Sequence, residues 1–147
     1  VNRGVNGIEG SLSTAVGYAI AHQEEEDVYC VIGDLSFFYD QNALWNESLP
    51  PNLSILLLNN GGGGIFHQLP GLERSPYRNS AIAAQHTTSA EGICQTHDIV
   101  YLSARNEEEL DKSLDKLFNS EERPVLLEVF TNAEEDTQAL KDYYQAF

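Results

Sequence analysis

Residues 28–34 read VYCVIGD, and residues 54–60 read SILLLNN. In both stretches a short apolar, β-rich run is followed at once by polar side chains, Asp34 in the first and Asn59-Asn60 in the second. Such runs predict short buried strands. In an open parallel sheet, ligands bind at the edge where the strands end. The two stretches therefore predict two strands of such a sheet, with a ligand site at their ends.

The rest of the chain continues the alternation of strands and helices. Pro50-Pro51 ends the helix that precedes the second strand, and Asn106 is a candidate N-cap. Strands that alternate with helices predict a three-layer α/β sandwich with a mainly parallel sheet. The expected strands are Val28–Ile32, Ser54–Leu58, Ile99–Leu102 and Val125–Phe130, and the expected helices are Gly10–His22, Phe38–Ser48, Ser89–Thr96, Glu107–Phe118 and Glu134–Tyr144.

Two segments interrupt this alternation. Gly61–Gly64 is a run of glycines with a high entropic cost of folding, and we attribute it to the close approach of backbone to a bulky ligand. It is neither a Walker loop nor a dinucleotide-binding fingerprint, because the required neighbouring residues are missing. Residues Leu69–His86 are predicted to form a long loop, and loops of this length are usually functional or mobile.

The composition limits the class of protein. The chain has 147 residues, of which 41% are apolar, which fits one domain with a core. A formal net charge of -15 argues against a nucleic-acid-binding surface. Much of the acid occurs in short runs such as Glu134–Asp136, which we interpret as solvated surface. No apolar stretch approaches the roughly 20 residues needed to span a bilayer, and no signal peptide is visible.

Further expectations concern the cysteines and the N-terminus. Cys30 falls in a predicted strand and Cys94 in a predicted helix, so we expect two buried free thiols in a reducing cytoplasm. The chain contains no Met and opens on Val1 inside an apparent motif, so we expect a fragment of a longer protein.

Asp34 and Asn60 are candidate metal ligands. A right-handed crossover would place both at the same sheet edge, where backbone carbonyls of the glycine run could add a third oxygen. Few hard oxygen ligands, with room left for phosphate and water, suit Mg²⁺. The pairing suggests a diphosphate held by a metal, whereas Asp34 alone could be only a helix cap. In the glycine-rich segment that leads into the first helix, Arg3 could clamp a carboxylate or be a surface charge.

These motifs together resemble the thiamine diphosphate-dependent enzymes and, within that family, the synthases of menaquinone biosynthesis. The wider family usually has Gly-Asp-Gly or Gly-Asp-Ala, whereas Gly-Asp-Leu-Ser is typical of that one subfamily. The resemblance is dense over residues 1–70 and thinner beyond. It rests on Asn2-Arg3-Gly4, Gly7-Ile8-Glu9-Gly10, Leu12-Ser13-Thr14-Ala15, Gly33-Asp34-Leu35-Ser36, Tyr39-Asp40, Asn42-Ala43-Leu44, Leu58-Asn59-Asn60, Ile65-Phe66 and Leu69-Pro70.

The resemblance implies a thiamine diphosphate-binding fold and roles for particular residues. Asp34 and Asn60 would bind Mg²⁺ through their side chains and Gly62 through its carbonyl. Arg3 would bind a substrate carboxylate, and Ile8 would wedge under the cofactor. Cofactor contacts are expected at Ile8, Gly33, Asp34, Leu35, Ser36, Asn60, Gly62 and Ile65, and substrate contacts at Arg3, Ile65 and Phe66. His67, Arg74 and Arg78 are near enough in sequence to contribute, but we favour loop-surface positions for them.

The implied reaction is decarboxylation of 2-oxoglutarate and addition of the succinyl unit to isochorismate, a transferase reaction that uses thiamine diphosphate and Mg²⁺. In such enzymes the activating Glu comes from a different domain on a partner subunit, and Glu9 is not that residue, so no catalytic residue is expected here. We therefore expect residues 1–147 to be the C-terminal diphosphate-binding domain of a cytoplasmic homo-oligomer, a dimer or tetramer, and to be inactive alone.

Two alternatives stay open. The chain could be a domain of another thiamine diphosphate enzyme, such as an acetolactate synthase-like enzyme or a 2-oxo acid decarboxylase. It could also be a non-catalytic α/β interaction module that keeps only the fold. Within the resemblance, the long loop Leu69–His86 is expected to be mobile when the cofactor is absent.

Overall fold

A four-stranded sheet forms the centre of the fold, with the strand order β1-β2-β4-β3. The computed structural model describes residues 7–46, 49–119 and 122–146. All three strand pairs are parallel, so the predicted α/β class is confirmed. The strands span Val28–Gly33 (β1), Leu53–Asn59 (β2), Val100–Ala104 (β3) and Val125–Phe130 (β4).

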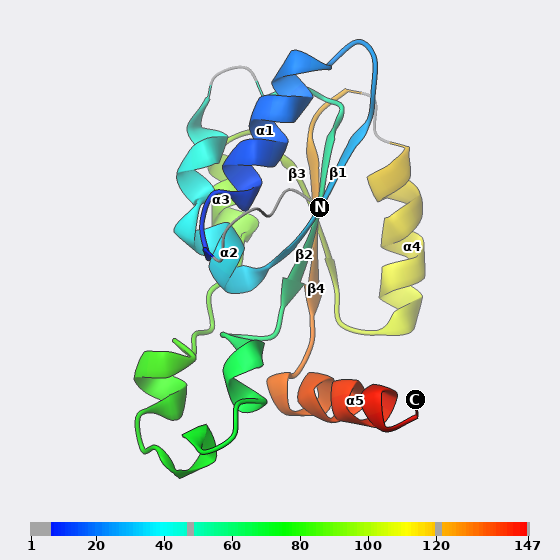
Figure 1. Ribbon diagram of the computed structural model, residues 1–147. Coiled ribbons are helices and arrows are strands. Elements are labelled where there is room, and N and C mark those ends of the chain that lie inside the picture. Colours follow the sequence, from blue (N-terminus) through cyan, green and yellow to red (C-terminus); the bar gives the residue numbers. More distant parts are fainter. Residues whose placement is uncertain (1–6, 47–48, 120–121, 147) are drawn as a thin grey trace.

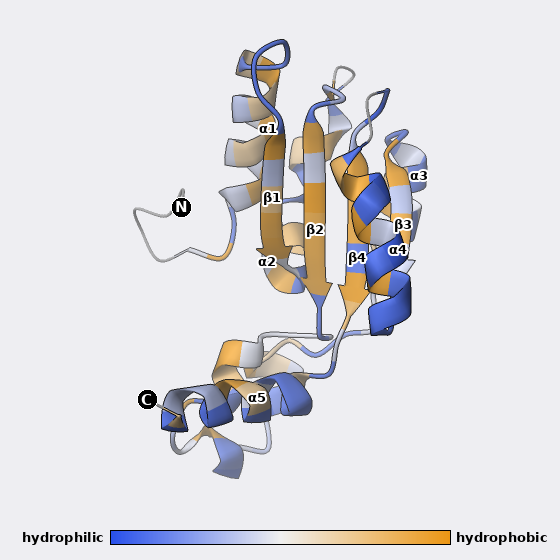
Figure 2. Cartoon of the chain, turned by 90° about the vertical axis from the view of Figure 1, so that its right-hand side faces the viewer, coloured by the Kyte–Doolittle hydropathy of each residue, from blue (hydrophilic) through white to orange (hydrophobic). Residues whose placement is uncertain are grey.

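Helices cover both faces of the sheet and make three layers (Figure 1). On one face lie α1 (Ser11–Ala21), α2 (Asp34–Tyr39) and α3 (Glu91–Thr96), and on the other lies α4 (Glu107–Phe118). Because both faces are covered, the central strands are nearly continuous apolar runs, as the hydropathy colouring of Figure 2 shows. The larger core lies on the side of α1 to α3, and the smaller core lies under α4.

The expected helix Phe38–Ser48 is not formed as one element. α2 starts earlier, directly at Asp34, and is followed by a 3₁₀ turn over Gln41–Trp45. Asp40 lies at the break, and its Oδ2 accepts the N–H groups of Gly10 and Ser13 at 3.0 and 2.8 Å. The carboxylate thus caps α1, which has no side-chain cap of its own, and this long-range contact competes with continuation of the helix.

The other helix ends follow local sequence rules more closely. Asn106 caps α4 as predicted, because its Oδ1 accepts the N–H of Glu109 at 2.9 Å. Asn132 does the same for α5 (Ala133–Gln145), accepting the N–H groups of Glu134 and Glu135. α5 lies across the carboxyl edge of the sheet rather than on either face (Figures 1 and 2).

The predicted long loop contains three short turns instead of unbroken coil. They are 3₁₀ turns over Gly64–His67 and Leu72–Arg74 and a π turn over Arg78–Ile82. The last residues return to the glycine run, where the Ala83 carbonyl accepts the N–H of Gly63 at 2.7 Å. The N–H of His86 donates to the Gly61 carbonyl at 2.9 Å. The mobility of this segment stays a prediction.

Within the described ranges, no helix combines the length and the apolar character that crossing a membrane requires.

Both cysteines are buried and free, as expected. Burial raises the pKa of the Cys30 thiol to about 11 and that of Cys94 to about 12, and Asp40 and Glu128 add to the two shifts. A raised thiol pKa leaves the unreactive protonated form at pH 8. We therefore expect iodoacetamide at pH 8 to alkylate both cysteines slowly in the native protein and rapidly in urea, measured by peptide mass spectrometry. Equal rates in the two conditions would contradict this.

Candidate functional site

A cavity of about 750 Å³ opens at the carboxyl edge of β1 and β2, between the sheet and α5. All predicted site residues within the described part of the chain line it, namely Ile8, Gly33, Asp34, Leu35, Ser36, Asn60, Gly62, Ile65 and Phe66. Arg3 lies outside the described residues. His67, Arg74 and Arg78 are not part of the cavity lining. The fold therefore gathers these positions in one place, and their individual roles stay predictions.

Asp34 joins the end of β1 to the glycine run after β2. Its side chain is buried, with an exposed fraction of 3%. Oδ1 accepts the N–H of Leu35, the next residue, at 2.7 Å. Oδ2 accepts the N–H of Gly62 at 2.8 Å, from a loop 28 positions away. Asp34 therefore links the two loops across the sheet edge, and it is one of the residues that line the cavity.

Asn60 carries an unpaired acceptor. Its Nδ2 donates to Asp136 Oδ2 at 3.3 Å, while its Oδ1 is buried and has no hydrogen-bond partner. A buried polar oxygen without a partner is unfavourable, and such atoms mark places where a water or an ion completes the contacts. Asn60 and Asp34 both line the cavity, and their side-chain oxygens are hard donors. The donor set therefore fits Mg²⁺.

The described side chains at this edge do not form a metal site from protein ligands alone. Within residues 7–46, 49–119 and 122–146, no group of three or more His, Cys, Asp or Glu side chains could hold a metal. The Gly62 carbonyl, the third predicted ligand, accepts the N–H of Gly64 at 3.0 Å and keeps a second lone pair. Mg²⁺ is commonly held by one or two carboxylates together with the phosphates of a ligand, and this edge matches that pattern.

The glycine run also packs closely against the protein itself, and our attribution of it to a bulky ligand stays a prediction. A Cβ on Gly62 would lie 2.8 Å from the Ala83 carbonyl oxygen, and one on Gly64 would lie 2.8 Å from Asn60 Nδ2. Gly61 has a φ of 80°, which favours glycine. The close approach comes from the end of the long loop and from the Asn60 amide. A side chain at Gly62 or Gly64 would disrupt these contacts.

His86 reaches this edge from the end of the long loop, and its position in the sequence gave no specific signal. Its Nε2 lies 3.2 Å from Asp34 Oδ2, although the two are not aligned as a hydrogen bond. Its Nδ1 accepts the N–H of Thr88 at 3.0 Å, which places the proton of the neutral ring on Nε2, toward Asp34. The ring packs edge-on against Phe38.

Glu128 is a fully buried carboxylate in β4 that sequence reasoning also missed. The run Val125–Phe130 suggested only an apolar strand. Burial and the hydrogen bond to Glu128 raise the pKa of Tyr101 to about 12, so this tyrosine remains a donor. The groups that donate to Glu128 are Asn59 Nδ2 at 2.7 Å, Ser89 Oγ at 2.7 Å, Tyr101 OH at 2.6 Å and Ala90 N–H at 3.2 Å.

Through Asn59, this network reaches the glycine run. Asn59 Nδ2 is held by Glu128 and by the Thr88 carbonyl, and its Oδ1 accepts the N–H of Gly61 at 3.1 Å. The side chain of Asn59 is therefore satisfied within the protein, whereas Asn60, which lines the cavity, keeps a buried oxygen without a partner.

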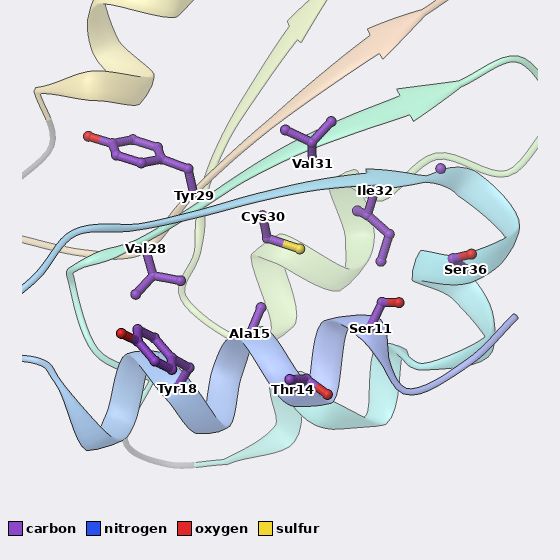
Figure 3. Close-up of a pocket in the computed structure, with 11 residues that line it drawn as sticks. Ser11, Thr14, Ala15, Tyr18, Val28, Tyr29, Cys30, Val31, Ile32 and Ser36 are labelled. Carbon is purple, nitrogen blue, oxygen red and sulfur yellow. The ribbon is translucent and has the colours of Figure 1, made fainter. Parts of the chain in front are cut away.

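A second hollow of about 490 Å³ lies between α1 and the edge strand β1 (Figure 3). Thr14 and Ala15 project toward it from α1, and Val28 and Cys30 from the strand. As far as the chain is described, its lining includes no carboxylate, imidazole or cationic side chain. The chemistry therefore concentrates at the carboxyl edge.

Comparison with known proteins places this geometry in a family. The profile of the family described as thiamine pyrophosphate enzyme, C-terminal TPP binding domain, matches residues 2–129. The chain belongs to this family. The predicted resemblance to thiamine diphosphate enzymes is thus confirmed, and the cavity lies at the carboxyl edge of a thiamine diphosphate-binding domain.

Three relatives of this thiamine diphosphate-binding domain carry the same name. The chain is 51% identical over 145 residues to the 2-succinyl-5-enolpyruvyl-6-hydroxy-3-cyclohexene-1-carboxylate synthase of Phocaeicola vulgatus, and 54% identical over 145 residues to that of Bacteroides thetaiotaomicron. It is 53% identical over 146 residues to that of Bacteroides fragilis. Each match covers 97% of this chain and 26% of the relative. The chain thus spans about a quarter of their length.

The contacts of Gly62 predict a destabilising substitution. In Gly62→Ala the new Cβ would meet the Ala83 carbonyl at 2.8 Å, so we expect the free energy of unfolding to fall by about 1–3 kcal/mol, as in overpacked sites. Urea denaturation measures it. Gly92→Ala is the control, because a Cβ there meets nothing within 4 Å and alanine favours the helix. A neutral Gly62→Ala would contradict the close approach.

The Glu128 network predicts a large stability effect. Glu128→Ala would leave the buried donors of Asn59, Ser89 and Tyr101 without their acceptor, so we expect a loss of about 3 kcal/mol in the free energy of unfolding. The control is Glu108→Ala in α4, which removes a carboxylate from an exposed pair with Lys112 and should change stability by less than about 0.5 kcal/mol. Similar losses in the two variants would contradict the buried role of Glu128.

Proposed function

We propose that this chain is the cofactor-binding domain of a thiamine diphosphate- and Mg²⁺-dependent synthase. The proposed reaction decarboxylates 2-oxoglutarate and adds the succinyl unit to isochorismate in menaquinone biosynthesis. The name and the identity of the relatives support the reaction. The observation that carries the metal-diphosphate site is the buried, unpaired Oδ1 of Asn60 beside the cavity that Asp34 also lines.

In this proposal the metal ligands are Asp34, Asn60 and the carbonyl of Gly62. When bound, thiamine diphosphate supplies the carbanion chemistry, while the protein supplies binding and orientation. The link between Asp34 and the Gly62 N–H sets the spacing of two of the three ligands. Because that link is within the protein, the ligand set is organised before any cation binds, which lowers the entropic cost of binding.

The diphosphate would lie along the start of α2. Gly33, Leu35 and Ser36 border the cavity there. The Leu35 N–H already donates to Asp34, so we propose the Ser36 N–H as the donor to a phosphate oxygen. Ser36 lines the same space, and its hydroxyl could donate to a phosphate oxygen.

Apolar side chains would form the rest of the wall. Ile8, Ile65 and Phe66 border the cavity together with Leu140 of α5. We propose that Ile8 supports the cofactor, and that Ile65 and Phe66 exclude water from the reacting carbons of the substrates. The side chain of Ile65 is 67% exposed, so this side of the cavity wall is open to solvent in this chain.

The remaining parts of the proposal concern the whole protein. The activating glutamate would come from another domain of a partner subunit within a homo-oligomer, and Arg3 would bind a substrate carboxylate. Two buried free thiols fit a reducing cytoplasm.

Cofactor binding tests the site. The protein that carries this chain is titrated calorimetrically with thiamine diphosphate, with and without Mg²⁺. In Asp34→Asn, which keeps the side-chain shape but loses the charge, we expect the Mg²⁺-dependent affinity to fall by more than the roughly 10–100-fold caused by losing an outer-sphere partner. Asp142→Asn, an exposed carboxylate on α5, is the control. Unchanged Mg²⁺ dependence in Asp34→Asn would refute the metal site.

The same preparation separates the related reactions. Product formation with 2-oxoglutarate and isochorismate is compared with turnover of pyruvate. We expect the first pair to react and pyruvate to be a poor substrate. Preferred turnover of pyruvate would favour an acetolactate synthase-like enzyme or a decarboxylase, and no cofactor binding at all would favour a non-catalytic module.

A further inference from the structure

Asp136 of α5 contacts the Asn60 amide from the far end of the chain, 76 positions away in sequence. Its Oδ2 accepts a hydrogen bond from Asn60 Nδ2 at 3.3 Å and another from the hydroxyl of Thr131 at 2.7 Å. Both Asp136 and Thr131 line the large cavity. Asp136 is half-buried, unlike its neighbours Glu134 and Glu135, so this member of the acidic run is not the solvated surface that we expected.

The contact determines which way the Asn60 amide faces. A side-chain amide has an oxygen that accepts and a nitrogen that donates, on opposite sides. With Nδ2 toward the Asp136 carboxylate, Oδ1 faces away from it, buried and without a partner. The reversed amide would bring two oxygens together at about the same distance, which is repulsive. Asp136 therefore selects the orientation that leaves a free oxygen.

Two further features hold this geometry. Thr131 follows β4 directly, and its N–H donates to the Asn59 carbonyl at 3.0 Å. The hydroxyl that anchors Asp136 thus comes from the strand next to β2. Gly64 leaves room for the amide, because a Cβ there would lie 2.8 Å from Asn60 Nδ2.

We propose that Asp136 is a positioning residue for the metal site: it holds Nδ2 of Asn60 and thereby presents Oδ1 to the Mg²⁺ that carries the cofactor diphosphate. This inference rests on the proposed function, because it takes Asn60 as a metal ligand. Residues that hydrogen-bond to a metal ligand and orient it typically change metal affinity about 10–100-fold when they are removed. The role requires an acceptor atom at position 136 and not a negative charge.

Mg²⁺ affinity tests the inference. Metal-depleted protein with saturating thiamine diphosphate is titrated with MgCl₂, and binding is followed by calorimetry. We expect Asp136→Leu, which has no acceptor, to raise the apparent Kd for Mg²⁺ by about 10-fold or more. Asp136→Asn keeps an acceptor oxygen and should stay close to wild type. Glu135→Leu, an exposed carboxylate in the same helical turn, controls for the loss of charge near the helix N-terminus.

Each outcome decides the question. A wild-type Kd in Asp136→Leu overturns the inference, and so does an Asp136→Asn variant as weak as Asp136→Leu, because charge and not orientation would then matter. Thermal melts without cofactor and metal show whether a variant is folded. If Asp136→Leu does not fold, Thr131→Val, which removes the anchor of Asp136, replaces it, and a raised Kd for Mg²⁺ is again expected.

Asp34→Asn in the same titration separates this inference from the proposed function. If Asp34→Asn binds Mg²⁺ as tightly as wild type, the metal site itself is wrong. If Asp34→Asn loses affinity while Asp136→Leu does not, the metal site stands and only the role of Asp136 is refuted.

Discussion

The hydrogen bond from the Gly62 N–H to Asp34 Oδ2 connects the segment after β1 to the segment after β2 at the carboxyl edge of the sheet. Asp34 directly follows β1, and Gly62 lies shortly after β2, so the bond sets the distance between two segments whose strands are already paired. A buried carboxylate needs such partners, because an unpaired charge away from water is strongly unfavourable. The glycine run and the end of the long loop, which packs against Gly62 through Ala83, depend on this link.

The side chains of Asn59 and Asn60, at the end of β2, differ in how fully they are hydrogen-bonded. Successive side chains of an extended strand point to opposite sides. Asn59 points into the protein, where Glu128 and the Gly61 N–H satisfy it. Asn60 is at the cavity, where Asp136 satisfies only its nitrogen. One residue therefore holds the loop in place while the other offers an oxygen to a ligand, and each is oriented by a carboxylate from a distant element.

The alternation of apolar runs and helices was sufficient to predict the parallel sheet, its carboxyl edge, and the meeting of Asp34 and Asn60 there. Local patterns also predicted the cap of α4 by Asn106. The interruption of the helix after Tyr39 was not predictable, because it depends on Asp40 reaching the first turn of α1. The close contacts of the glycine run within the protein were not predictable either, since those of Gly61 and Gly62 come from residues 83–86.

The sequence by itself determined the fold class, the family and the set of residues at the edge, because strand and helix periods and short motifs are local properties of the chain. Only the tertiary structure decided which polar groups satisfy one another. Glu128 looked like part of an apolar strand and Asp136 like part of a solvated acidic run, and His86 lay in an unassigned loop. Glu128 and Asp136 bind asparagines 69 and 76 positions away, and hydrogen bonds at such separations are set by the packing of the sheet, which no local pattern encodes.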